Sequence, residues 1–228
     1  MLNMAFDQLD EHEQSEVVRK WVRDNAASIL AGVVLGLLAI FGYFQWKSHQ
    51  LRQQVVAAGE FQNFGAAVGA KNDERSKAAL ELMQKEHAGS AYAVIASMRW
   101  AEAAVARKDL AAAEQSLQWA YDHAGDKALK SLAGQNLARV KLGADKAAEA
   151  LALLDSLPTE AYAASIAELR GDILLVQGKR DEARTAYQAS IDALEPTAPN
   201  RQTVEMKRDD AAGAIAAPAV AAAEKQSS

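Results

Sequence analysis

The stretch ELRGDILLVQGKRDEARTAYQASIDALEP, residues 168–196, contains a complete helix–turn–helix plan. Two runs of helix-forming residues are separated at Gly178. A small residue, Gly171, lies in the first run, and Ala183 and Tyr187 lie one turn apart in the second. Two helices approach closely where small residues cross, and a large side chain one turn away fills the space beside the crossing. The stretch therefore predicts a tightly packed helical hairpin.

Two earlier stretches repeat this plan. Residues 99–121 have a break near Lys108, and residues 136–158 have one near Gly143. The first helices carry small residues at equivalent places, Ala101, Ala138 and Gly171, and the second helices carry the pairs Ala113 and Leu117, Ala150 and Leu154, and Ala183 and Tyr187. One hairpin cannot bury its apolar face alone, so neighbouring hairpins stack. The chain is therefore predicted to be all-α, with an α-solenoid of about three to four helix pairs over residues 47–210.

The small residues at the crossings, a repeat close to 34 residues and Pro196 after the last second helix resemble the tetratricopeptide repeat. Residues 168–196 match that repeat best. The two earlier units depart from it, with Ala in place of Gly171 and Leu in place of Tyr187. An ordinary array of helical hairpins is the alternative.

The flanks of the repeats also read as helical. Residues 51–68 form one expected helix, and Asn72 or Asp73 is suited to cap a second that runs to about His87. A last helix is expected within residues 199–211, covering the end of the stack. The Ala-rich residues 211–228 are predicted to be a disordered tail.

The most apolar run extends from Trp21 to Trp46, and residues 25–46 carry no charge. As a helix these 22 residues span about 33 Å, against a hydrocarbon core of about 30 Å. A soluble core helix of that length would show a polar stripe, and a cleaved signal would have a short basic start and a small-residue exit. Because 24 mostly polar residues precede the run and bulky QWKSHQ follows, residues 25–46 are predicted to be an uncleaved transmembrane anchor.

Basic residues near the ends of the anchor favour a cytoplasmic segment 1–24, but only by three to two. They are Arg19, Lys20 and Arg23 before the anchor, and Lys47 and Arg52 after it. Ser28, Gly32 and Gly36 recur every four residues within the anchor. Such a face can admit another membrane helix, although glycine is also simply common in membrane helices.

Composition limits the possible chemistry. The chain has no cysteine, which excludes disulfides and thiolate sites. Residues 47–228 hold 22 basic and 24 acidic side chains, so no positive surplus points to nucleic acid. The four histidines are scattered, and no phosphate-binding loop, nucleophile elbow or dinucleotide fingerprint is present. We therefore expect a non-enzymatic protein without cofactor or metal.

Binding is the better expectation, because stacked hairpins present the inner faces of their first helices as a concave groove. Six residues in the repeat register are candidates for that groove: Met98, Glu102, Gln135, Arg139, Glu168 and Asp172. Each could instead be an ordinary exposed residue. The predicted groove is mixed and mildly acidic, and it lacks the basic cluster that would clamp an acidic peptide terminus.

Specific segments add a family resemblance over residues 10–211. SEVVRKWVRDN leads into the anchor, WKSHQ leaves it, and LARV and AELRGDILLVQGKRDEARTAYQAS follow in the repeats. These segments resemble the YfgM family of bacterial inner-membrane proteins. The resemblance implies a cytoplasmic N-terminus, a periplasmic repeat domain, and an ancillary role at the SecYEG translocon with the periplasmic chaperone PpiD. It also implies a link to the Rcs response regulator through the N-terminal segment.

Two functions therefore compete. The first is a membrane-anchored binding module that links protein export to periplasmic chaperones. The second is an inner-membrane-anchored tetratricopeptide scaffold for another envelope assembly or division machine. An enzyme is a third possibility, but no set of residues in the sequence forms a recognisable catalytic motif.

Overall fold

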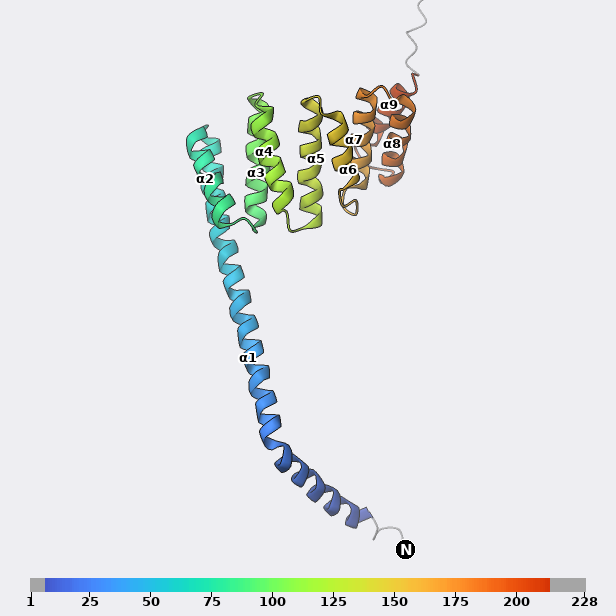
Figure 1. The fold of residues 1–228 in the computed structure, drawn as a ribbon. Coiled ribbons are helices and arrows are strands. Elements are labelled where there is room, and N and C mark those ends of the chain that lie inside the picture. The colour runs from blue at the N-terminus through green and yellow to red at the C-terminus, as the bar shows by residue number, and fades with distance from the viewer. Residues whose placement is uncertain (1–6, 214–228) are drawn as a thin grey trace, which may run out of the picture. The chain divides into compact units, whose positions relative to one another are not determined.

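The computed structural model describes residues 7–213, and within that range the chain forms nine α-helices and no strand (Figure 1). The long helix α1, Asp7–Gly69, includes both the predicted anchor, residues 25–46, and the helix expected over residues 51–68. The predicted disordered tail lies outside the described residues, apart from residues 211–213. The all-helical prediction is confirmed.

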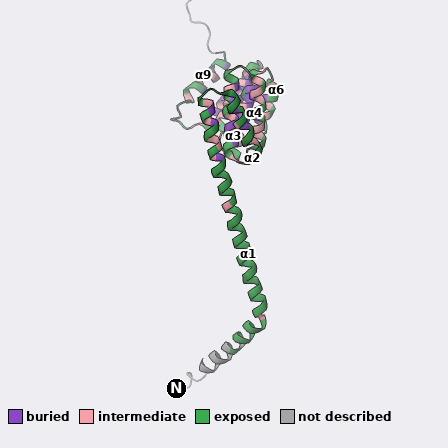
Figure 2. Ribbon diagram, turned by 90° about the vertical axis from the view of Figure 1, so that its left-hand side faces the viewer, coloured by how far each residue is buried: buried purple, intermediate pink, exposed green. Residues whose placement is uncertain are grey.

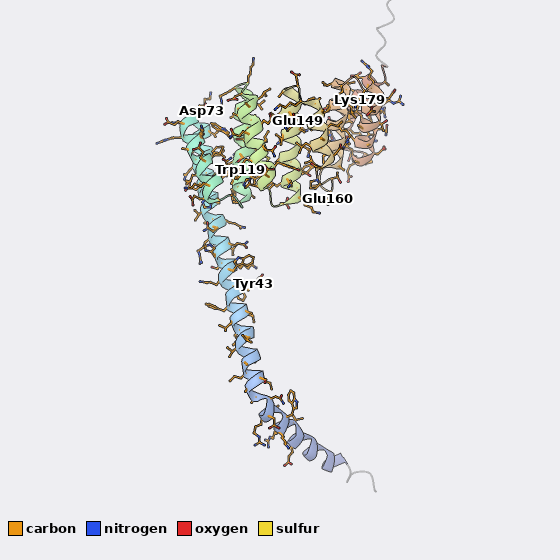
Figure 3. All side chains as sticks on the ribbon, in the orientation of Figure 1. Tyr43, Asp73, Trp119, Glu149, Glu160 and Lys179 are labelled. Carbon is orange, nitrogen blue, oxygen red and sulfur yellow. The ribbon has the colours of Figure 1, made fainter. Side chains whose placement is uncertain are left out.

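Helix α1 is long and apolar enough over Val18–Gly69 to cross a membrane. Its most apolar window has a mean hydropathy of 2.2, and none of that window is buried against other parts of the protein. Exposed residues dominate the helix in Figure 2, including the aromatic Tyr43 that Figure 3 labels. The chain divides into two compact units between Val55 and Val56, nine residues beyond the end expected for the anchor.

The second unit is a row of helix pairs, which follow one another in chain order in Figure 1. Residues 56–69 of α1 and helix α2, Asp73–Glu86, enclose a small core around Phe64 and Met83. The next pairs are α3, Ala91–Ala106, with α4, Leu110–His123; α5, Lys127–Gly143, with α6, Ala147–Asp155; and α7, Ala163–Val176, with α8, Arg180–Ala193. The stack therefore has four pairs, and helix α9, Arg201–Ala211, follows it.

The predicted crossing residues are buried where the helices of each pair meet. All the alanines at these positions have no exposed surface, and their large partners are at most 2% exposed; these residues are Ala101, Ala113 and Leu117, Ala138, Ala150 and Leu154, and Ala183 and Tyr187. In the α7–α8 pair, a Cβ on Gly171 would lie 2.5 Å from the Tyr187 ring. Glycine is therefore required where the partner is tyrosine, while alanine suffices where the partner is leucine.

The same turn closes all four pairs. One residue with positive φ ends each first helix, at Lys71, Lys108, Asp145 and Gly178, with φ between 53° and 77°. In each turn its N–H donates to the carbonyl three residues back, and the next N–H donates to the carbonyl five residues back, at 2.9–3.1 Å. This is the Schellman arrangement that ends many helices. The second break therefore lies at Asp145, because Gly143 is still helical.

Polar side chains begin several helices as expected. Asn72 caps α2 by accepting from the Arg75 N–H at 3.0 Å, and Asp109 caps α4 by accepting from the Ala112 N–H at 3.0 Å. At the other end of the stack, α9 packs on α8 and buries Val204 and Ala211 beside Tyr187. The predicted last helix is therefore present and covers the apolar end of the final pair.

An ion cluster ties α4, α5 and α6 together. Lys141 Nζ lies 2.9 Å from Glu114 Oε1 and 2.7 Å from Glu149 Oε2, and Lys146 Nζ lies 2.8 Å from Glu114 Oε2. Hydrogen bonds from Lys146 and from Lys141 hold the pKa of Glu114 below the usual glutamate range. The Lys141 pKa is raised by its hydrogen bonds to Glu149 and Glu114, which outweigh its partial burial.

Candidate binding groove

A cavity of about 560 Å³ opens between the first helices of two neighbouring pairs, α3 and α5, with α4 behind it. Its lining is predominantly apolar and comes from Ile95, Met98, Ala101, Val105, Leu110, Leu117, Leu132, Val140 and Gly143, with Arg99, Glu102, Asn136 and Arg139 as its polar members. Cavities of this size and character are typical of ligand sites in proteins.

One wall of the cavity is a single face of α3. Met98, Glu102 and Val105 are spaced by four and three residues, so their side chains lie on the same side of the helix. Met98 is half-buried, and Val105 is 43% exposed although it is a large apolar residue. An apolar side chain left open beside a cavity indicates a surface that a partner can cover.

The facing wall is built in the same way by α5. Leu132, Asn136, Arg139 and Gly143 recur at spacings of four, three and four residues and therefore lie on one face. The Asn136 amide donates to Met98 Sδ at 3.9 Å across the two walls, and Arg139 Nη1 donates to Asn136 Oδ1 at 3.3 Å. The Asn136–Met98 contact joins the two walls, while Arg139 stays exposed.

The charges at the rim are mostly basic. Arg99 and Arg139 contribute two positive charges and Glu102 one negative charge, and all three are exposed. The Arg99 guanidinium carbon lies 5.0 Å from the centre of the Phe61 ring, a cation–π distance that orients it. The local balance is therefore positive, which differs from the mildly acidic groove expected for the whole concave face.

Three of the six predicted groove residues line this cavity: Met98, Glu102 and Arg139. Gln135 does not, because it is only 2% exposed and lies inside the stack. Its Oε1 accepts from Ser165 Oγ of α7 at 2.7 Å, and its Nε2 donates to the Ser131 carbonyl at 3.3 Å. Gln135 thus joins two successive first helices to each other.

Glu168 and Asp172 come together on α7, but they are occupied by α9. Lys207 Nζ donates to Glu168 at 2.7 Å and to both oxygens of Asp172 at 2.9 and 3.0 Å. Asp172 also accepts from the Tyr187 hydroxyl at 2.9 Å. Burial lowers the pKa of Lys207, but its hydrogen bonds to Glu168 and Asp172 outweigh burial and raise the pKa. Burial and the hydrogen bond to Asp172 raise the pKa of Tyr187.

Charged residues at equivalent places in successive first helices alternate in sign. They are Glu102, Arg139 and Asp172, followed by Lys207 of α9, at intervals of 37, 33 and 35 residues. Among the residues that the structure describes, Asp172 and Lys207 form an ion pair, while Glu102 and Arg139 do not. Of the three steps in this series, only the last is an ion pair, and the step from Glu102 to Arg139 borders the cavity.

Ten of the thirteen lining residues were outside the predicted groove set, among them Arg99, Val105, Leu132 and Asn136. These four had a usable signal, because each lies three residues from a predicted position on the same helix. Leu117 was identified only as a crossing residue, yet it also reaches the cavity floor.

Among the side chains that the structure describes, those of residue 16 and residues 18–213, no group of three or more His, Asp or Glu is arranged to hold a metal. His123 is used structurally, since its ring stacks on Trp119 at 4.1 Å between centroids and bonds the Trp119 carbonyl (Trp119 is labelled in Figure 3). The arrangement of the described residues is suited to holding a partner by burial and charge.

The small-residue face of α1 is open within its own unit. Ser28, Gly32 and Gly36 are exposed, and a methyl group at either glycine would meet no atom within 4 Å. The face is free to take a neighbouring helix, and its role as a docking face stays a prediction.

A family model described as "Tetratricopeptide repeat-like domain" matches residues 19–213. A protein of Escherichia coli strain K12 named "Ancillary SecYEG translocon subunit" is 31% identical over 182 residues, which are 80% of this chain and 87% of that protein. Proteins of the same name from Haemophilus influenzae and Neisseria gonorrhoeae are each 26% identical, over 81% and 88% of this chain and 90% and 97% of their own lengths. No solved structure gives a significant match.

Proposed function

Because the chain belongs to the YfgM family of ancillary SecYEG translocon subunits, with their tetratricopeptide repeat-like domain, we propose that it is a membrane-anchored binding module of the SecYEG translocon. The observation that carries this proposal is the pairing of two features in one chain. One is an apolar helix with an unburied window, and the other is a stack of helix pairs with an open apolar cavity between two of its first helices, α3 and α5.

The anchor comprises residues 25–46 in the bacterial inner membrane. Residues 1–24 lie in the cytoplasm and residues 47–210 in the periplasm, an orientation supported by the three-to-two excess of basic residues before the anchor. The face of Ser28, Gly32 and Gly36 packs on a translocon helix. A periplasm-dependent enzyme reporter fused after Ala211 tests the orientation, since a stable but inactive fusion contradicts it.

The repeat domain receives polypeptides that emerge from the translocon and passes them to periplasmic chaperones, among which PpiD is the partner. The N-terminal segment contacts the Rcs response regulator on the cytoplasmic side. The face of the first helices supplies the polypeptide-binding surface, with Met98, Glu102 and Arg139 at the cavity, while Lys207 of α9 occupies Glu168 and Asp172.

Affinity purification of the full chain from crosslinked native membranes tests the translocon role. SecYEG subunits and PpiD are expected with the natural chain. The variant Gly32→Leu/Gly36→Leu should recover less SecYEG, while Gly42→Leu, also at an open position of α1, is the matched control. A natural chain that recovers no SecYEG when well expressed contradicts the proposal. Recovery of division or envelope-assembly proteins instead would favour the scaffold alternative.

A further inference from the structure

We propose that the cavity between α3 and α5 binds a polypeptide segment through one apolar side chain that is flanked by carboxylates. This inference rests on the proposed function, because it names the ligand chemistry of the same concave face. It adds that binding is confined to the first half of that face, at α3 and α5.

The cavity interior selects an apolar side chain. Ile95, Met98, Val105 and Leu132 surround it, and the polar atoms of Asn136 are already engaged with Met98 and Arg139. Methionine is unbranched and adapts to side chains of different shape. The site therefore suits any large aliphatic or aromatic side chain, as a receptor for varied unfolded segments requires.

The rim selects acidic neighbours on either side of that apolar residue. Arg99 and Arg139 stand on opposite walls and outnumber Glu102. Guanidinium groups hold carboxylates through paired hydrogen bonds. Glu102 is an acceptor suited to a backbone N–H of the bound segment. Charge complementarity thus points to an acidic flank, and a basic flank would meet two like charges.

The other half of the concave face is already filled by the chain itself. Lys207 of α9 stands where the side chain of a further repeat or a ligand would lie, and it neutralises Glu168 and Asp172. The Tyr187 ring fills the crossing behind them, whereas Leu117 at the equivalent place of the α3–α4 pair lines the cavity. The ligand site is open only where neither the lysine nor the tyrosine is present.

The test uses the full chain in lipid nanodiscs, because detergent tails could enter the apolar cavity. The probe is a fluorescein-labelled glycine–serine peptide with a central Asp-Leu-Asp, followed by fluorescence anisotropy, with empty nanodiscs as the blank. Replacing the peptide leucine by serine should weaken binding by about 10- to 100-fold, as expected for loss of one buried aliphatic side chain. Val105→Asp in the protein should weaken binding similarly.

Charge reversal gives a second, independent measurement. Arg139→Glu should weaken binding of the Asp-Leu-Asp peptide about tenfold and improve binding of a Lys-Leu-Lys peptide. Val176→Asp is the matched control, since Val176 is an exposed valine of α7 outside the cavity lining, and it should leave the affinity unchanged. Far-UV circular dichroism checks that each variant is folded.

The inference is overturned by an absence of saturable binding up to about 1 mM peptide. It is also overturned by affinity that is indifferent to leucine in the peptide or to Val105→Asp in a folded variant. Peptide binding without recovery of SecYEG from membranes contradicts the translocon role and supports the cavity. Recovery of SecYEG without peptide binding contradicts the cavity alone.

Discussion

The α3–α4 and α7–α8 pairs follow the same plan and reach it with different residues. The first pair crosses at Ala101 and Leu117, and the last crosses at Gly171 and Tyr187. Each crossing combines one small and one large side chain, so the two side chains together fill the space between the helices. What differs is reach, because the Tyr187 hydroxyl extends to Asp172 on the concave face and a leucine cannot.

The residue at the crossing distinguishes a repeat that is filled by its own side chains from one that leaves a cavity. Where tyrosine is present, the crossing, the concave face and α9 form one hydrogen-bonded unit with Asp172 and Lys207. In the α3–α4 pair, Leu117 holds the same position and lines the cavity. One change at the crossing therefore alters the concave face one helix away.

The largest expected effect is at the glycine of the last crossing. Gly171→Ala should lower the free energy of unfolding by about 2–3 kcal/mol, because the new methyl group overlaps the buried Tyr187 ring. Adding Tyr187→Leu should restore part of the loss by recreating the alanine–leucine solution of the first pair. Urea unfolding of the single and double variants measures the coupling. If the effects of the two substitutions on the unfolding free energy simply add, the glycine–tyrosine and alanine–leucine pairs are not interchangeable ways to pack the crossing.

Introducing glycine and tyrosine at the crossing of the α3–α4 pair should fill its cavity. Ala101→Gly/Leu117→Tyr places a phenol ring where the cavity floor lies. We expect binding of the Asp-Leu-Asp peptide to weaken about tenfold, or about 1.4 kcal/mol, while the helix content is kept. Anisotropy titration in nanodiscs checks this. Full affinity in a folded double variant would contradict the view that leucine keeps the cavity open.

The turns of the two pairs offer a smaller contrast. Lys108 and Gly178 occupy the same left-handed position, with φ of 62° and 77°. Lys108→Gly should stabilise the chain by up to about 1 kcal/mol, and Gly178→Ala should destabilise it by about 1 kcal/mol, because side chains with a Cβ are strained there. Thermal unfolding of both variants provides the comparison. Equal and same-signed shifts would contradict equivalence of the turns.

The smallest expected effect concerns acid. The folded pKa of Glu114 is lowered, so its ion cluster contributes fully above the unfolded pKa of about 4.3 and is lost as pH falls through the folded pKa. Glu114→Gln should therefore flatten the fall of unfolding free energy between about pH 5 and pH 3, by under 1 kcal/mol because the groups are partly exposed. Glu102→Gln, outside any ion pair among the described residues, is the control. If unfolding free energy falls with pH at the same rate in both variants, the ion cluster does not contribute to the acid sensitivity of the fold.

The fold could be predicted largely because its determinants are local and periodic. Small residues such as Ala138 recur at a fixed interval, and the alternation of apolar and polar residues follows the helix period. The pair formed by residues 56–69 and α2 was harder to identify as a repeat. Its first helix is continuous with the long apolar helix α1, so no break in the sequence marks where this pair begins.

The site was predicted less completely, because its residues depend on partners distant in sequence. Gln135 is polar and lies in the groove register, but Ser165, thirty residues on, satisfies it inside the stack. Lys207 carries no local signal, since its role follows only from the packing of α9 on α8. Met98, Glu102 and Arg139 line one cavity, and helix geometry alone places Met98 and Glu102 on one face of α3; their role in binding stays a prediction.

The repeated turn has a consequence for how such a chain can change over time. Lys71, Lys108 and Asp145 are each 37 residues apart and make the same hydrogen bonds. A segment cut from one turn to the next is therefore a self-consistent unit that can be duplicated or lost as a whole. Duplication or loss of such a unit would change the number of binding positions along the first helices and leave the packing of α9 and Lys207 on the last pair unchanged.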